Sequence, residues 1–242
     1  MVGKSALLRG ARSVAKTRSR LQAVTVSRRY RRHTMIGRRA FIDNLMIAQR
    51  YAPPGGEVVE CGVWRGGMIR GLADVLGPYR KYHLFDSFEG LPPAEKELDG
   101  QTAVAWQQDT ASPYYYDNCG ADESYARGLF QGSGYDVEFH PGWFADTIPK
   151  YQPERPISVL RLDGDWYEST MTCLRGLIPH LAPKALILVD DYFYWEGCAR
   201  ALHDYLAETK SMMRIRQSPF AGVCYLINQD SGHAPTWPAG VW

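Results

Sequence analysis

The sequence lacks the features of a membrane-spanning or secreted protein. No apolar run approaches the roughly 18 residues that a helix needs to span a bilayer. The basic N-terminus is not followed by the apolar stretch of about 7–15 residues that marks a secretory signal peptide. The five cysteines are odd in number, widely spaced and without a C-x-x-C pair, so they imply no zinc site and favour a reducing compartment. We therefore expect a cytoplasmic protein.

Acidic residues are missing from the first 39 positions. This segment holds twelve of the 28 basic residues, and the first acid is Asp43. The remaining 16 basic residues face all 26 acidic ones, which gives residues 40–242 a net charge of −10. We expect a basic leader over 1–40, followed by one folded domain over 41–242, a length that suffices for a single core.

Three interpretations of the leader stay open. Apolar residues recur near helical spacing in it, which favours a surface or self-association helix that pairs with acidic patches, and we expect the protein to be a homodimer. An Arg-rich, acid-free segment also fits a targeting peptide. It fits equally a basic arm for nucleic acid or anionic lipid. The apolar positions are Leu7, Leu8, Ala11, Val14 and Ala15.

No internal repeat or low-complexity tract is present, and β-like and helical patterns alternate along the domain. Alternation of this kind indicates βαβ units and an α/β fold with a mostly parallel sheet. Between the second strand and the next helix, residues 88–121 are rich in Pro, Tyr and Gly, and we expect an irregular lid or binding loop there. The expected strands are 58–61, 82–85, 137–139, 157–162, 185–189 and 222–227, and the expected helices are 41–51, 68–76, 122–130, 169–181 and 197–209.

The first strand runs into a glycine-rich turn that contains neither G-x-G-x-x-G nor a Walker Gly-Lys-Ser/Thr. Glycines at this place allow a tight turn close to a ligand. Asp86 ends the second strand about 20 residues further on, where an acid commonly accepts hydrogen bonds from ribose hydroxyls. The combination favours an adenosine-type cofactor without a pyrophosphate. The alternative is that the glycines serve packing and the aspartate caps a helix.

Four aspartates follow two of the expected strands: Asp163 and Asp165 after one, Asp190 and Asp191 after the next. The carboxyl ends of parallel strands meet at one edge of the sheet, where open α/β sheets bind their ligands. Crowded carboxylates repel each other, so we expect a cation between them. A hard divalent ion such as Mg²⁺ takes oxygen ligands of this kind.

Five motifs in order resemble the macrocin O-methyltransferase family, over about residues 41–228. They are VECGVWRGG (59–67), DSFEGLP (86–92), GWFADT (142–147), DGDWYEST (163–170) and DDY (190–192) with Trp195 and Gly197. The resemblance implies a Rossmann-like class I methyltransferase dependent on S-adenosylmethionine (SAM), with a mostly parallel seven-stranded sheet and helices on both faces. It also implies SAM- and Mg²⁺-dependent methylation of sugar or phenolic hydroxyls in the biosynthesis of antibiotics and related natural products.

The resemblance further implies that Asp163, Asp190 and Asp191 ligate Mg²⁺ and that Asp165 is the general base. An ordinary carboxylate, whose pKa is about 4, is far too weak a base to deprotonate an aliphatic hydroxyl in water. A divalent ion that coordinates the acceptor oxygen lowers its pKa and orients it. No His or Lys lies within these motifs. Asp163 and Asp165 can exchange the two roles, because Gly164 loosens the geometry between them.

The cofactor residues follow from the same motifs. Glu60, Gly62 and Val63 are expected at the methionine end of SAM and Asp86 at the ribose. Ser87, Gly142 and Trp143 are expected near the adenine. Of the three tyrosines over 114–116, at most two can face one side and form an aromatic wall, and Trp166 is either a substrate contact or part of the core.

We therefore expect a methyltransferase that acts on a hydroxyl of a small molecule, most simply a sugar on a glycosylated natural product. One alternative is an RNA methyltransferase that uses the basic arm; the acidic body, which would repel phosphate, and the lack of an Asn-Pro-Pro-Tyr-type motif weaken it. Another is a non-catalytic scaffold that binds SAM or metal. The sequence does not identify the acceptor.

Overall fold

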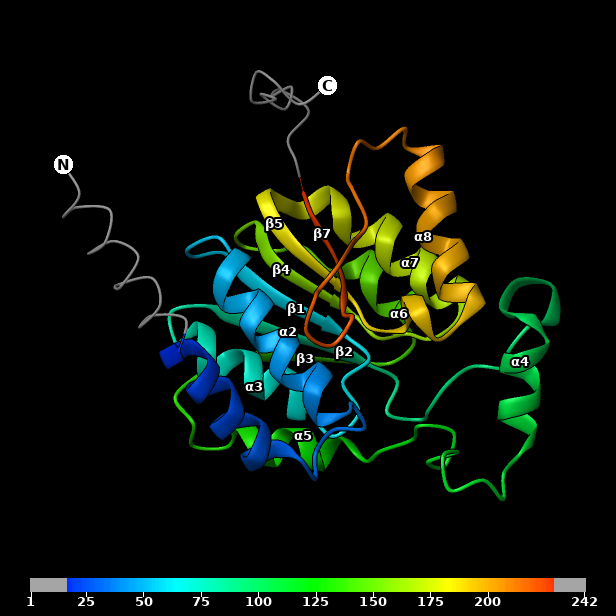
Figure 1. The fold of residues 1–242 in the computed structure, drawn as a ribbon, viewed down its shortest axis with the longest axis horizontal. Coiled ribbons are helices and arrows are strands. Elements are labelled where there is room, and N and C mark those ends of the chain that lie inside the picture. The colour runs from blue at the N-terminus through cyan, green and yellow to red at the C-terminus, as the bar shows by residue number, and fades with distance from the viewer. Residues whose placement is uncertain (1–16, 229–242) are drawn as a thin grey trace.

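The computed structural model describes residues 17–228. Its centre is a seven-stranded sheet in the order β3-β2-β1-β4-β5-β7-β6 (Figure 1). β3, β2, β1, β4 and β5 are parallel to their neighbours, whereas β7 runs antiparallel to both β5 and β6. The mostly parallel sheet expected from the resemblance is confirmed. The strands are β1 (Glu57–Cys61), β2 (Lys81–Asp86), β3 (Asp136–Pro141), β4 (Ile157–Leu162), β5 (Leu181–Val189), β6 (Arg216–Gln217) and β7 (Cys224–Ile227).

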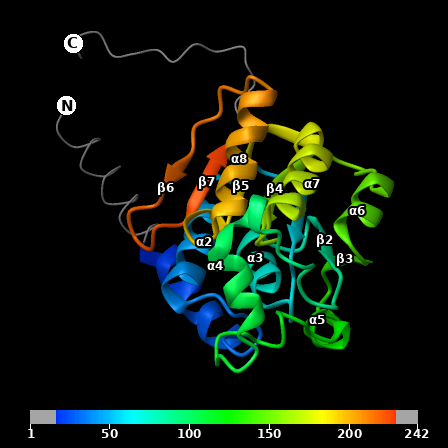
Figure 2. The ribbon, with the colours of Figure 1, turned by 90° about the vertical axis from the view of Figure 1, so that its right-hand side faces the viewer.

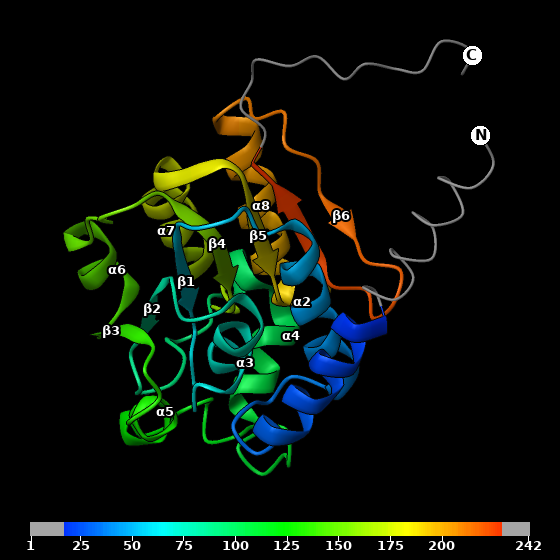
Figure 3. The same cartoon turned by 90° about the vertical axis from the view of Figure 1, so that its left-hand side faces the viewer.

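Helices cover both faces of the sheet, because neighbouring strand residues point to opposite faces and each face carries its own core. Val58 packs with the helix over 17–30, α2 and α3 on one face, and Val59 packs with α7 and α8 on the other. Figure 3 shows the sheet between these two layers. The helices are α2 (Arg38–Tyr51), α3 (Gly67–Leu76), α4 (Lys96–Gln108), α5 (Glu123–Phe130), α6 (Phe144–Thr147), α7 (Tyr167–Leu177) and α8 (Glu196–Glu208), with short 3₁₀ turns η1 (Ile148–Lys150), η2 (Ile178–His180) and η3 (Asp191–Phe193).

The second half of the basic leader is part of the folded body. Residues 17–30 form a helix whose apolar side is buried in the same core as α2 and α3, with Ala23 at 0% exposure. Its end is fixed by Asp74 of α3, which accepts a hydrogen bond from the Tyr30 hydroxyl (2.8 Å) and pairs with Arg29 (3.1 Å). The core therefore crosses the boundary expected at residue 40. The apolar positions noted between residues 7 and 15 lie outside the described residues.

The expectation of an irregular segment over 88–121 is wrong for its middle part, which forms α4. This helix has a kink at Gly100 (φ +84°) and buries only two side chains, Asp99 and Ala103, so it lacks the apolar periodicity that identifies a helix in a sequence. α4 lies to the right of the sheet in Figure 1, and Figure 2 shows it in front of the strand ends and below α8, with which it is in contact. Asp99 connects it to the body, since its carboxylate accepts hydrogen bonds from the backbone N–H of Glu95 (2.8 Å) and of Tyr167 at the start of α7 (2.7 Å).

Two smaller differences concern the second half of the chain. α7 ends at Leu177 and not at 181, because η2 with Pro179 follows it directly and β5 already begins at Leu181. The two-residue strand β6 is too short to show a pattern in the sequence.

Among residues 17–228, no helix combines the length and the apolar character needed to cross a membrane.

Candidate active site

Two cavities open at the carboxyl edge of the parallel strands and meet above β1 and β4. The smaller has a volume of about 340 Å³ and the larger of about 1000 Å³. Asp163 and Asp165 line both cavities. Two molecules bound in the two cavities would therefore meet at these carboxylates. The residues that line both are Met35, Gly62, Trp64, Cys119, Asp163 and Asp165.

The glycine turn after β1 lies directly against the aspartate motif after β4. Gly62 has φ +85°, and a Cβ atom at this position would collide with the carbonyl oxygen of Asp163. The turn is fixed on both sides, because Gly62 N–H donates to the Phe85 carbonyl (2.9 Å) and Asp163 N–H donates to the Cys61 carbonyl (2.9 Å). A glycine is therefore required both by the backbone angle and by the close approach of the two segments.

Gly62→Ala is expected to destabilise the protein more than Gly55→Ala does. Gly55 also has a positive φ (+72°), but no atom lies within 4 Å of a Cβ there, so both variants carry the cost of a positive φ, about 1–2 kcal/mol, and only Gly62→Ala adds the collision with Asp163. Urea unfolding of the two variants measures the difference. Equal losses of unfolding free energy would show that the turn can move away from Asp163.

The expected cofactor residues divide into those that line a cavity and those that lie behind it. Glu60 and Gly142 line neither cavity. Asp86, at the end of β2, accepts three backbone hydrogen bonds: Oδ2 from Val63 (2.6 Å) and Trp64 (2.8 Å), and Oδ1 from Phe88 (2.7 Å). Burial raises the pKa of Asp86, and these hydrogen bonds oppose the rise. Gly62, Asp86, Ser87 and Trp143 line the smaller cavity, and Gly62 and Val63 line the larger one.

Arg161 of β4 is the residue of the site that the sequence analysis missed. Its side chain is fully buried and contacts three carboxylates: Glu60 (2.9 Å), Asp163 (2.8 Å) and Asp190 (2.7 Å). Burial raises the pKa of Glu60 to about 8, and Arg161 opposes this rise. The guanidinium thus connects the end of β1, the end of β4 and the end of β5. Its only signal in the sequence is a charged residue inside an apolar strand.

The structure brings together three of the four aspartates, Asp163, Asp165 and Asp191, so that the expected base lies in the group and the expected ligand Asp190 does not. Each of the three offers one oxygen, and these oxygens all lie within 4.8 Å of one another. Asp165 has φ +57°, its N–H donates to Asp191 Oδ2 (3.1 Å), and its Oδ1 accepts a hydrogen bond from Trp195 Nε1 (2.8 Å). Asp190 pairs with Arg161 through Oδ1, so that its Oδ2 is the oxygen left for another ligand.

The electrostatics of this cluster suit a cation. Burial raises the pKa of Asp165 to about 8, and Asp163 adds to the rise. Burial raises the pKa of Asp190 to about 6 against the effect of Arg161, and burial with Asp165 and Asp163 raises that of Asp191. A divalent ion would reverse these shifts, since an opposite charge favours the ionised carboxylates. An all-oxygen donor set of carboxylates fits Mg²⁺.

Aromatic side chains line the mouth of the larger cavity. Tyr114 and Tyr116 line it, whereas Tyr115 contacts Trp106 with ring centroids 5.7 Å apart, which confirms that at most two of the three tyrosines share one side. Trp166 is 1% exposed and lines neither cavity, so it belongs to the core. Trp106, Tyr194 and Trp195 extend the same aromatic lining.

The turn after this aromatic segment has an unusual backbone. Tyr116, Asp117, Asn118 and Cys119 all have positive φ, between +51° and +62°. Asn118 fixes the turn through hydrogen bonds from its side-chain amide to the Leu91 carbonyl (2.7 Å) and from Leu91 N–H to its carbonyl (3.0 Å). The turn therefore brings Cys119 to the junction of the two cavities.

Comparison with known proteins decides the family. The model of the macrocin O-methyltransferase (TylF) family matches residues 6–225. The chain belongs to the macrocin O-methyltransferase family. Members with curated functions include 8-demethyl-8-(2,3-dimethoxy-alpha-L-rhamnosyl)-tetracenomycin-C 4'-O-methyltransferase of Streptomyces olivaceus, 35% identical over 72% of this chain and 67% of that one. Mycinamicin III 3''-O-methyltransferase of Micromonospora griseorubida is 34% identical over 72% and 70%.

Solved structures agree with this membership. The O-methyltransferase NovP superposes with a TM-score of 0.66 and 27% identity, over 82% of this chain and 83% of that one. The calicheamicin methyltransferase CalS11 has the same fold, with a TM-score of 0.59 and 20% identity over 79% and 78%. The chain is thus a SAM-dependent O-methyltransferase of class I fold.

Proposed function

We propose that this family member methylates a sugar hydroxyl on a glycosylated natural product, with Mg²⁺ as cofactor. The meeting of the two cavities at Asp163 and Asp165 carries this proposal: the smaller cavity would hold SAM and the larger one the acceptor. The relatives whose names specify a tetracenomycin rhamnoside and a mycinamicin support a sugar-bearing acceptor. The aromatic lining around Tyr114 and Tyr116 suits the apolar faces of sugar and aglycone rings.

In this proposal Asp163, Asp190 and Asp191 hold Mg²⁺ and Asp165 is the general base. Bound there, the ion would lower the pKa of the acceptor hydroxyl and orient it. Asp165 lines both cavities, and its Oδ1 is positioned by Trp195, which leaves Oδ2 to take the hydroxyl proton. Arg161, which also lines the larger cavity, holds Asp163 and Asp190 through ion pairs of 2.8 and 2.7 Å.

The cofactor side of the proposal rests on the glycine turn. Gly62 lets the backbone lie against Asp163, and Asp86 fixes the turn through the N–H groups of Val63 and Trp64. Asp86 Oδ2 already accepts two hydrogen bonds, whereas Oδ1 accepts one and retains a lone pair for a ribose hydroxyl. Ser87 and Trp143 line the same cavity and would contact the adenine. Glu60 and Gly142 do not line it and would support the residues that do.

Chelation of divalent ions is expected to abolish methylation. SAM and a panel of glycosylated acceptors are incubated with the protein, and the product is detected by a mass gain of one methylene unit. With EDTA the rate should fall about 100-fold or more, because a metal contributes several kcal/mol of transition-state stabilisation and 1.4 kcal/mol corresponds to tenfold. Excess Mg²⁺ should restore it. Full activity in EDTA, with SAM binding unchanged in calorimetry, would rule out the metal.

The RNA alternative needs a different experiment from deletion of the leader. Residues 17–30 are packed in the core, so that removing 1–39 would disturb the fold itself. Exposed leader arginines that lie among the described residues can instead be replaced by Gln, namely Arg28, Arg31 and Arg32. Salt-dependent retention of RNA by the wild type, lost in this variant, would favour RNA as acceptor. SAM binding without turnover on any acceptor would favour the scaffold.

A further inference from the structure

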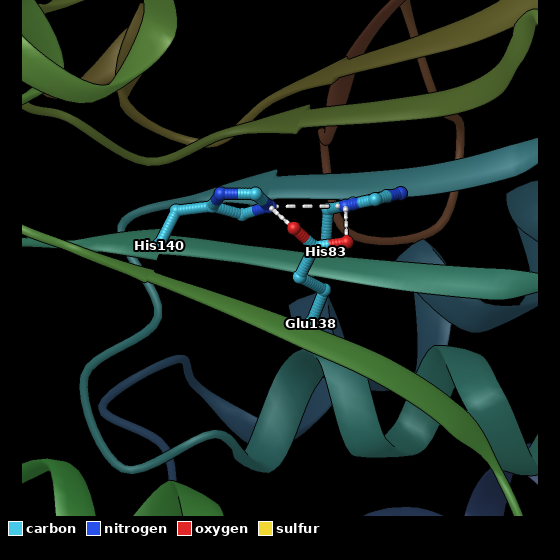
Figure 4. A group of neighbouring side chains, drawn as sticks. All are labelled: His83, Glu138 and His140. Atoms are coloured by element: carbon cyan, nitrogen blue, oxygen red, sulfur yellow. Dashed lines mark hydrogen bonds and ion pairs between the residues drawn. The ribbon is translucent and has the colours of Figure 1, made fainter. Parts of the chain in front are cut away.

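A second group of metal-ligating side chains lies outside the candidate active site, on strands β2 and β3. It consists of His83, Glu138 and His140. His83 is the cross-strand partner of Glu138, and Glu138 and His140 are two residues apart on β3, so all three point to the same face of the sheet. Figure 4 shows the three side chains converging on one point.

The distances are those of a compact donor set. His83 Nδ1 lies 3.0 Å from His140 Nε2. Glu138 Oε2 lies 3.8 Å from His83 Nδ1, and Glu138 Oε1 lies 3.8 Å from His140 Nε2. Two imidazole nitrogens and one carboxylate form a donor set that binds Zn²⁺ with its fourth position open to another ligand.

The outer contacts of His83 favour this use of its ring. Glu57, at 0% exposure, places Oε2 3.1 Å from His83 Nε2. This contact is a close approach of charge and not a hydrogen bond, since Nε2 has no hydrogen-bond partner among residues 17–228. An ionised carboxylate at this distance still favours the tautomer with its proton on Nε2, which leaves the lone pair of Nδ1 for the cluster. Glu57 is itself fixed by the Tyr151 hydroxyl (2.9 Å) and by Arg155 N–H (3.1 Å).

The other two side chains are also positioned. The ring of His140 stacks on Phe85, with centroids 4.1 Å apart and planes inclined by 8°. Glu138 Oε2 pairs with Lys81 (2.8 Å), and Oε1 is left for a metal.

We propose that His83 Nδ1, His140 Nε2 and Glu138 form a binding site for a divalent ion of the zinc class, separate from the Mg²⁺ site. Solvent reaches the group from the side of Glu138, whose side chain is 47% exposed. The ion would connect edge strand β3 to β2, three residues before Asp86 and two before Gly142. It would thereby stabilise the two strand ends that border the smaller cavity.

The competing arrangement contains no metal. In it, His140 Nε2–H donates to His83 Nδ1 and the pair serves only as a hydrogen bond within the sheet. The two arrangements differ in one observable property, because a metal requires lone pairs on both nitrogens whereas a hydrogen bond requires a proton on one of them. Zinc binding and the protonation of these nitrogens therefore separate them.

The test is a zinc titration of the full-length protein in excess Mg²⁺, which keeps the aspartate cluster occupied. We expect one zinc ion with two imidazole ligands by X-ray absorption, and a thermal midpoint that rises with zinc. His140→Gln and Glu138→Gln should each lower zinc affinity at least 10-fold, since even outer-shell changes cost 10–100-fold. Glu154→Gln is the matched control: Glu154 pairs with the same Lys81 at 2.8 Å but lies outside the cluster, and this variant should bind zinc as the wild type does.

Several results would overturn the site. Absence of zinc binding is one, and zinc binding that persists in both cluster variants but disappears in Asp191→Asn is another, because the ion would then sit on the aspartates. A third is a ¹⁵N NMR spectrum in which His140 Nε2 stays protonated in the presence of zinc. None of these measurements depends on methyl transfer, so their outcome is independent of the proposed function.

Discussion

Arg161→Met is expected to lower the free energy of unfolding by about 3–5 kcal/mol, the cost of breaking a buried ion pair by removing one partner. Arg161 is 0% exposed and is the shared partner of Glu60, Asp163 and Asp190. Methionine fills a similar volume but leaves these carboxylates without a counter-charge in a buried place. Urea unfolding followed by fluorescence measures the loss.

The matched control is Arg175→Met. Arg175 pairs with Glu208 at 2.9 Å, with side chains 58% and 50% exposed, and such surface pairs contribute about 0–1 kcal/mol. Should Arg161→Met fail to fold, Arg161→Lys keeps the charge but loses the planar fork that reaches three partners, and it should fall between the wild type and Met. Equal stability of the Arg161 and Arg175 variants would refute the role of Arg161 as the counter-charge of the site.

Asp165→Asn should reduce kcat by about 10²–10⁴-fold, the usual contribution of a general base. Asn retains an oxygen that can accept the hydrogen bond from Trp195 Nε1, so the side chain should keep its position while losing its basicity. Steady-state kinetics with saturating SAM and Mg²⁺ measures kcat, and calorimetry measures the affinity for both. Asp204→Asn is the control, because Asp204 lies on α8 and accepts a hydrogen bond from the Tyr167 hydroxyl (3.0 Å) away from both cavities.

Kinetics and calorimetry together distinguish a general base from a Mg²⁺ ligand. If Asp165 is the base, Asp165→Asn keeps its Mg²⁺ affinity and Asp163→Asn loses it. If Asp163 is the base, Asp163→Asn keeps its Mg²⁺ affinity and Asp165→Asn loses it. Wild-type kcat in Asp165→Asn would exclude Asp165 from proton transfer altogether.

The sequence was sufficient for the parallel strands and for the edge at which the aspartates meet, because buried strand segments such as 185–189 are continuous apolar runs with clear ends. It was not sufficient for Arg161. A charged residue in a buried strand must have partners, and one of them, Asp163, lies just after the end of the same strand as Arg161. The other two partners come from β1 and from the end of β5, and only the register of β1, β4 and β5 shows which carboxylates they are.

α4 escaped prediction for a different reason. Asp99 reaches the first turn of α7 across 68 positions of sequence, Trp106 packs against Trp166 and Trp195, and the helix also contacts α8. Only Asp99 and Ala103 are buried, so these contacts leave no run of apolar residues at helical spacing, on which helix prediction rests.

The left-handed turn over 116–119 has a consequence for how new acceptor preferences can arise in this protein. Backbone conformations of this kind cost about 1–2 kcal/mol per residue other than Gly, with Asn and Asp the best tolerated, and they persist only where surrounding contacts fix them. Insertions or deletions within the turn would release Asn118 from Leu91 and displace Cys119 from the junction of the cavities. New acceptor preferences are therefore expected to arise by point replacements at Tyr114 and Tyr116, whose side chains can change while the path of the backbone stays the same.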